Sequence, residues 1–129
     1  MSHFFQDIKV GQEIDLGSFT FTADHIKRYA AIYDPQPFHM DETLAARSHF
    51  GALCASGWQT ASIWMRLYVL HKQKEAQSLE SQGLDVATMG PGLGAKNMRW
   101  LKPVYAGDTL HYRSTILAKR PSESRPGWG

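Results

Sequence analysis

The sequence lacks the features that mark several large classes of protein. Cys54 is the single cysteine among 129 residues, so neither a disulfide framework nor a cysteine-based zinc site can form within one chain. The N-terminus has no basic head followed by an apolar run, which a signal peptide would need. The most apolar window, Ile63–Leu70, is too short to cross a bilayer and contains Arg66. We therefore expect a cytoplasmic protein in a reducing compartment, without a membrane segment.

Charge is low and evenly spread. Charged residues make up 20% of the chain, and the net charge is +2 with histidine neutral. This is too weak and too scattered for a nucleic-acid-binding surface. Hydrophobic residues make up 43%, so the chain can form a core and is not disordered. The length suits one compact domain, and we interpret residues 1–129 as a single domain.

Motifs that hold cofactors or metals are missing as well. No GxGxxG, Walker or GxSxG pattern occurs. The glycine-rich stretch "GPGLG", residues 90–94, precedes no helical pattern and is interpreted as a hairpin. We expect no metal site and no bound cofactor, because five histidines show no metal-ligand spacing with one another or with nearby carboxylates. These are His3, His25, His49, His71 and His111.

Helical patterns occupy the middle of the chain. Thr22 is a candidate N-cap for a helix that Pro35 ends, since the residue before a proline avoids the helical region. A second short helix is expected within residues 41–51. From residue 58 to 70 the sequence "WQTASIWMRLYVL" is apolar around most of a helix, which continues as a polar pattern to Gly83. A helix of this kind is expected to be buried on all sides.

Strand-like patterns lie on both sides of these helices. Short alternating or apolar stretches occur at residues 6–22, 84–90, 93–104 and 110–119. In the last of these, Leu110 and Tyr112 point to one face while His111 and Arg113 point to the other. The predicted fold class is α+β, with an antiparallel sheet wrapped around one long central helix.

The segment "DPQPFH", residues 34–39, carries the first candidate site. Pro35 and Pro37 fix the backbone, so we expect a stiff loop that holds Asp34 and His39 in a set relation. An ionised carboxylate and an imidazole can polarise one water molecule between them. The spacing alone is also compatible with a carboxylate that merely ends a helix and a histidine that is merely packed.

The segment "CASGW", residues 54–58, carries the second candidate site. Backbone N–H groups at a helix N-terminus can receive a carbonyl oxygen that becomes an oxyanion, and Gly57 would let a ligand approach closely. The alternative is structural, with Ser56 as a helix cap and Gly57 as a packing residue. Cys54 is more simply a small buried hydrophobe than a nucleophile. Trp58, Trp64 and Tyr68 are more simply core or dimer contacts than a cofactor site.

Together these segments resemble the MaoC-like dehydratase family of hotdog-fold proteins, which includes the (R)-specific enoyl-CoA hydratases. The stretch "YDPQPFHMDETLAARSHFGALCASGW" follows the family signature, with Asp34 and His39 at the positions of its catalytic pair. The family's next landmarks correspond to "HFG" at 49–51 and "SG" at 56–57. The stretch "MRWLKPVYAGDTL" at 98–110 is similar to the family's strand–turn–strand after the central helix.

The resemblance implies reversible hydration of a trans-2-enoyl-CoA to a 3-hydroxyacyl-CoA, in fatty acid metabolism. Asp34 and His39 would share one water, with Asp34 as base and His39 as proton donor. The Gly57 amide, with Ser56 beside it, would bind the thioester carbonyl. The acyl-CoA would be the small-molecule substrate, and a homodimer or higher homo-oligomer is implied. Candidate contacts to the CoA moiety are Lys96, Arg99 and Lys102.

Four positions depart from the family pattern. Gln36 replaces the usual Asn, Tyr33 a frequent Gly, Ser56 the usual His, and Met65 a Ser that contributes in some hydratases. The chain also ends where the family normally adds two more antiparallel strands. The departures leave the acyl chain and its carrier, CoA or acyl carrier protein, open.

Three other functions remain compatible with the sequence. A hotdog thioesterase would activate water with a carboxylate and would not need His39. A non-catalytic acyl-CoA-binding module would bind ligand without turnover. A structural subunit, partner to an active homologue, would bind none. The retained pair of Asp34 and His39 favours the hydratase, because the last two functions do not require it.

Overall fold

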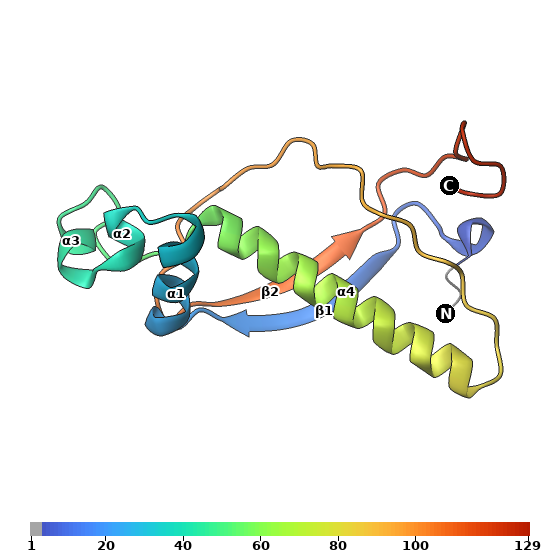
Figure 1. The fold of residues 1–129 in the computed structure, drawn as a ribbon, viewed down its shortest axis with the longest axis horizontal. Helices are drawn as coiled ribbons and strands as arrows, with labels where there is room; N and C mark the ends of the chain where they lie inside the picture. The colour runs from blue at the N-terminus through green and yellow to red at the C-terminus, as the bar shows by residue number, and fades with distance from the viewer. Residues whose placement is uncertain (1–3) are drawn as a thin grey trace.

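The structure is a computed structural model that describes residues 4–129. Three short helices gather at the N-terminal end of one long helix, and a two-stranded antiparallel sheet lies along one side of that helix (Figure 1). The α+β class, the long central helix and the antiparallel strands expected from the sequence are confirmed. The elements are η1 (Phe5–Asp7), β1 (Glu13–Thr20), α1 (Ala23–Tyr33), α2 (Pro37–Met40), α3 (Glu42–Ala46), α4 (Gly57–Ser81) and β2 (Thr109–Thr115).

A bulge in β1 lets apolar residues on both sides of it face the core. The register against β2 shifts between Asp15 and Gly17, and Gly17 has a φ of 85°, which glycine adopts without strain. Ile14 and Leu16 face the core before the bulge, and Phe19 packs against the core after it. The inward residues therefore change from even to odd positions within one strand.

The short helices place the first candidate site. Thr22 caps α1, accepting a hydrogen bond from the His25 amide at 3.2 Å, and the helix ends before Pro35 as expected. The expected loop between Asp34 and His39 is instead partly helical, because Pro37 occupies the first turn of α2, where a missing N–H costs nothing. The second short helix, α3, covers only Glu42–Ala46 of the expected range 41–51.

The central helix has the predicted length but not the predicted burial. It runs from Gly57 to Ser81, yet Trp58 is 58% exposed and Met65 is 51% exposed. The expectation that α4 is buried on all sides is wrong for the described residues, because the two strands cover only one of its sides (Figure 1).

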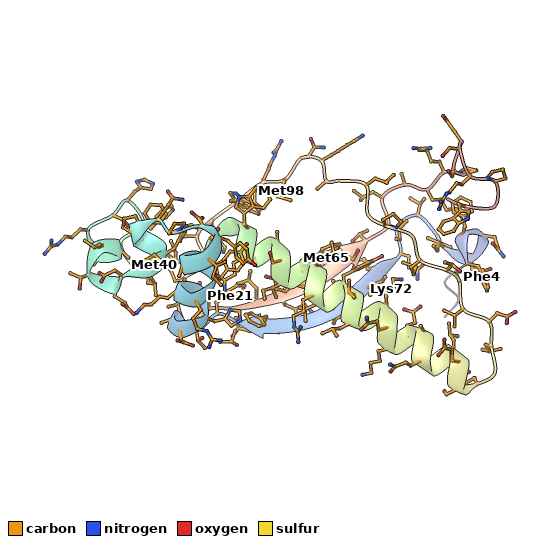
Figure 2. The ribbon with its side chains drawn as sticks, viewed as in Figure 1. Phe4, Phe21, Met40, Met65, Lys72 and Met98 are labelled. Carbon is orange, nitrogen blue, oxygen red and sulfur yellow. The ribbon has the colours of Figure 1, made fainter. Side chains whose placement is uncertain are left out.

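Residues 84–104 return along the helix without forming a strand. The strands predicted at 84–90 and 93–104, and the hairpin between them, are absent from this described segment. A strand needs a neighbour to pair with. The segment bonds backbone at its two ends, where the Leu84 amide donates to the Leu79 carbonyl at 3.0 Å and the Ala55 amide donates to the Val104 carbonyl at 2.8 Å. Cys54 and Tyr105 then form an isolated antiparallel bridge. Figure 2 shows Met98 on this segment, near the N-terminal half of α4.

The core lies where β1, the short helices and the start of α4 meet. Phe21 is fully buried at the junction of β1 and α1 (Figure 2). The core cluster consists of Phe21, Ile26, Ala45, Leu53, Ala55 and Ile63.

Among the helices that the structure describes, none has the length and apolar character needed to cross a membrane.

We predict that Phe21→Ala lowers the free energy of unfolding by about 3–5 kcal/mol, because it leaves a large cavity in a fully buried position. Urea denaturation followed by circular dichroism measures the change. Leu117→Ala is the control and should change the free energy by less than ~0.5 kcal/mol, since Leu117 is 84% exposed. A loss below ~1 kcal/mol for Phe21→Ala would contradict the core described above.

Candidate active site

Asp34 is held at the end of α1. Its amide donates to the Ala30 carbonyl at 2.9 Å, and its own carbonyl accepts from the Gln36 amide at 2.8 Å. These bonds fix the backbone on both sides of the side chain. The carboxylate is thereby directed toward α2, where His39 lies.

His39 is buried and its protonation is set by a backbone carbonyl. Its Nδ1 atom lies 2.6 Å from the Cys54 carbonyl oxygen. A carbonyl oxygen only accepts hydrogen bonds, so Nδ1 carries the proton and donates it. The second ring nitrogen, Nε2, is therefore the atom that can gain or lose a proton, and it faces the carboxylate of Asp34.

The contact between the two side chains is favourable only when a hydrogen-bond donor is present, either on Nε2 itself or on a water molecule. His39 Nε2 lies 3.3 Å from Asp34 Oδ2. With Nδ1 protonated, a neutral imidazole would present a lone pair to a carboxylate, and two acceptors repel each other. The contact becomes favourable when Nε2 is protonated and donates, or when a water molecule donates to both atoms. The geometry thus suits a pair that exchanges protons with one small molecule.

Two neighbouring side chains favour the ionised form of Asp34. Gln36 Nε2 donates to Asp34 Oδ1 at 2.8 Å, and the Ser56 side chain also lowers the pKa of the carboxyl. Burial pushes the pKa of Asp34 up, but the bonds from Gln36 and Ser56 and the charge of protonated His39 outweigh it and hold the pKa below its ordinary value. Gln36 and Ser56 are two of the positions that depart from the family pattern.

The start of α4 supplies the second part of the site. Ser56 caps the helix, accepting a hydrogen bond from the Trp58 amide at 3.3 Å. Gly57 is the first helical residue, so its amide has no acceptor within the helix. Ser56 therefore affects both candidate segments, since it orders the helix start and lowers the pKa of Asp34.

One cleft of about 1200 Å³ brings the candidate residues together. Asp34, His39, Ser56 and Gly57 all line it. Of the three cationic candidates, Arg99 and Lys102 line the cleft, whereas Lys96 is not among its lining residues. Among residues 4–129, no group of three or more His, Cys, Asp or Glu side chains could hold a metal ion.

Sequence reasoning missed two groups at this site. The Cys54 carbonyl, which orients His39, is a backbone atom that no motif marks. Trp100 also lines the cleft, and its indole lies against the Cα of Gly57. In the sequence Trp100 stands in "RWLKPV", and nothing in this pattern indicates a contact with a residue more than forty positions earlier.

Comparison with known proteins identifies the family. The MaoC-like domain matches residues 5–126. The chain belongs to the MaoC-like dehydratase family. Among curated proteins it is 29% identical over 121 residues to the uncharacterized protein YdeM of Bacillus subtilis, covering 94% of this chain and 78% of YdeM.

Solved structures agree with this assignment. The MaoC-like dehydratase from Rhodospirillum rubrum is 37% identical with a TM-score of 0.70, covering 95% of this chain and 76% of that one. The (R)-hydratase from A. caviae, described as involved in PHA biosynthesis, is 26% identical with a TM-score of 0.55, covering 94% of this chain and 80% of that one.

We predict that Gln36→Leu raises the pKa of Asp34, because the lost hydrogen bond favours the ionised carboxylate. A carboxyl whose pKa is lowered by folding stabilises the fold above its unfolded pKa, and this contribution disappears as the pH falls through the folded pKa. In the variant the folded and unfolded pKa values lie closer together, so the acid-dependent loss of stability should be smaller and should be complete at a higher pH. Titration of the Asp34 carboxyl carbon by NMR measures the shift. Gln82→Leu removes a contact to Ser78 on α4 and should leave the Asp34 titration unchanged. If Gln36→Leu also leaves it unchanged, Gln36 does not lower the pKa of Asp34.

We also predict that Gly57→Ala is destabilising because of Trp100. An added Cβ would lie 2.5 Å from two indole carbons, and such overpacking costs about 1–3 kcal/mol. The same substitution in a Trp100→Ala background should cost nothing, because the obstacle is gone. A double-mutant cycle of unfolding free energies measures the coupling. Equal costs in both backgrounds would show that the indole does not lie against Gly57 in solution.

Proposed function

We propose that the protein catalyses the reversible hydration of a trans-2-enoyl thioester, with Asp34 and His39 sharing the water molecule. The observation that carries the proposal is the bond from His39 Nδ1 to the Cys54 carbonyl, which leaves Nε2 3.3 Å from the Asp34 carboxylate. Membership of the MaoC-like dehydratase family supports it, as does the similarity to an (R)-hydratase.

The proposed reaction uses each group once. The Asp34 carboxylate removes a proton from water as the water oxygen bonds to Cβ of the enoyl group. Protonated His39 delivers its Nε2 proton to Cα, since its Nδ1 proton is held by Cys54. The proton on Asp34 then returns to His39 Nε2 across their direct contact. The net change is addition of one water across the double bond.

The remaining cleft residues fit binding roles. The Gly57 amide, at the positive end of the α4 dipole, would donate to the thioester oxygen and stabilise the enolate that forms during the reaction. Arg99 and Lys102, on the cleft wall, would face the phosphates of a CoA carrier. Exposed apolar side chains on α4, such as Met65 and Val69, support the proposal of a homodimer, since such surface is normally covered.

We predict that Asp34→Asn and His39→Ala each lower kcat/KM by at least about 100-fold, because each removes a proton-transfer group. The loss of enoyl-thioester absorbance on a panel of trans-2-enoyl-CoAs measures the reaction. Glu75→Gln and His71→Ala are matched controls, because Glu75 and His71 form an acid–histidine pair and neither residue lines the cleft. Both variants should keep wild-type activity.

The same assay separates the other functions. A thiol reagent detects free CoA, and its release by wild type and by His39→Ala alike would indicate a thioesterase. Light scattering reports the oligomeric state of each variant. A folded wild type that hydrates no short, medium or branched substrate would overturn the proposal.

A further inference from the structure

Trp100 lies directly on the residue proposed to bind the carbonyl. Three ring atoms of its indole, Cγ, Cδ2 and Cε2, would lie within 2.9 Å of a Cβ built on Gly57. The ring is therefore in van der Waals contact with the glycine itself. A ligand group bound at the Gly57 amide would therefore lie close to this indole.

Trp58 extends the same surface. Its ring meets Trp100 edge to face, with centroids 5.6 Å apart and planes at 75°, a favourable arrangement for two aromatic rings. Both side chains line the cleft, and both remain half-exposed, at 58% and 50%. Together Trp58 and Trp100 form an apolar wall beside Gly57, which we call the indole wall.

We infer that Trp100 limits the size of the acyl group that the cleft accepts. This inference rests on the proposed placement of the thioester oxygen on the Gly57 amide. Two parts of the ligand extend from the thioester carbonyl, the polar carrier on the sulfur side and the acyl hydrocarbon on the other side. Only the hydrocarbon gains free energy by contact with an apolar wall, so it runs along Trp58 and Trp100. A short acyl group can lie on this wall while the Trp100 ring stays packed on Gly57, whereas a long acyl group has to displace that ring.

The position of Trp100 is fixed from its C-terminal side. Val104, four residues later, accepts a hydrogen bond from the Ala55 amide just before α4, and Pro103 restricts the intervening backbone. The segment that carries the indole is thereby anchored beside the start of α4. A second aromatic group in the cleft, formed by Phe38 and Phe50 with centroids 4.9 Å apart, packs near His39 instead.

Binding of saturated acyl-CoAs tests the inference without turnover. Isothermal titration calorimetry compares butanoyl-CoA with octanoyl-CoA on wild type and Trp100→Ala. We expect wild type to prefer butanoyl-CoA, and Trp100→Ala to shift the ratio of affinities toward octanoyl-CoA by about tenfold or more. Trp100→Phe, which keeps a smaller ring, should give an intermediate ratio, and circular dichroism confirms that each variant is folded.

Two controls make the result specific. Trp128→Ala removes an indole outside the cleft, in contact with Arg125, and should leave the ratio unchanged. Phe50→Ala opens the other aromatic group and should leave it unchanged as well. An unchanged ratio in Trp100→Ala, a shift in Phe50→Ala instead, or no binding of either ligand would overturn the inference. A wild type that shows the expected ratios but hydrates no enoyl-CoA would overturn the hydratase proposal and leave the role of Trp100 standing.

Discussion

The hydrogen bond from His39 to the Cys54 carbonyl is the constraint on which the site depends. It joins α2 to the segment that leads into α4, so the acid–histidine pair and the helix N-terminus have a fixed relation. It also decides which nitrogen of His39 carries the permanent proton. Without it the imidazole could rotate or change tautomer, and Nε2 would no longer be the atom that meets Asp34. One backbone carbonyl thus sets both the geometry and the chemistry of the imidazole.

Two of the four departures from the family pattern, Gln36 and Ser56, lie beside Asp34 and alter its surroundings without removing its charge. Gln36 donates to one carboxylate oxygen, and Ser56, which caps α4, also favours the ionised form. Both side chains therefore lower the pKa of Asp34 and oppose the effect of burial. The effect of these two departures on Asp34 is electrostatic.

Local chemistry made part of this structure predictable. Thr22 and Pro35 bound α1 because capping and proline sterics act within a few residues, and β2 keeps the predicted alternation. The helical turn at Pro37 was missed because four residues are too few to show a period. The burial of α4 and the strands at 84–104 were wrong because apolar sequence shows what can be buried, whereas burial and pairing depend on a neighbouring element. The two prolines already suggested a fixed relation between Asp34 and His39, although the spacing also fits a structural role. Bringing Gly57 to this pair was accessible only through the family resemblance.

Gly57 shows how one small residue can be required by its neighbours and not by its own backbone. Its backbone is helical and any residue could adopt it. The limit is the indole of Trp100, which occupies the space of a Cβ. With no side chain at this position, the amide stays open to the cleft while the aromatic wall approaches within contact distance. The proposed carbonyl site and the indole wall therefore meet at the same residue, so a change in either one would alter the other.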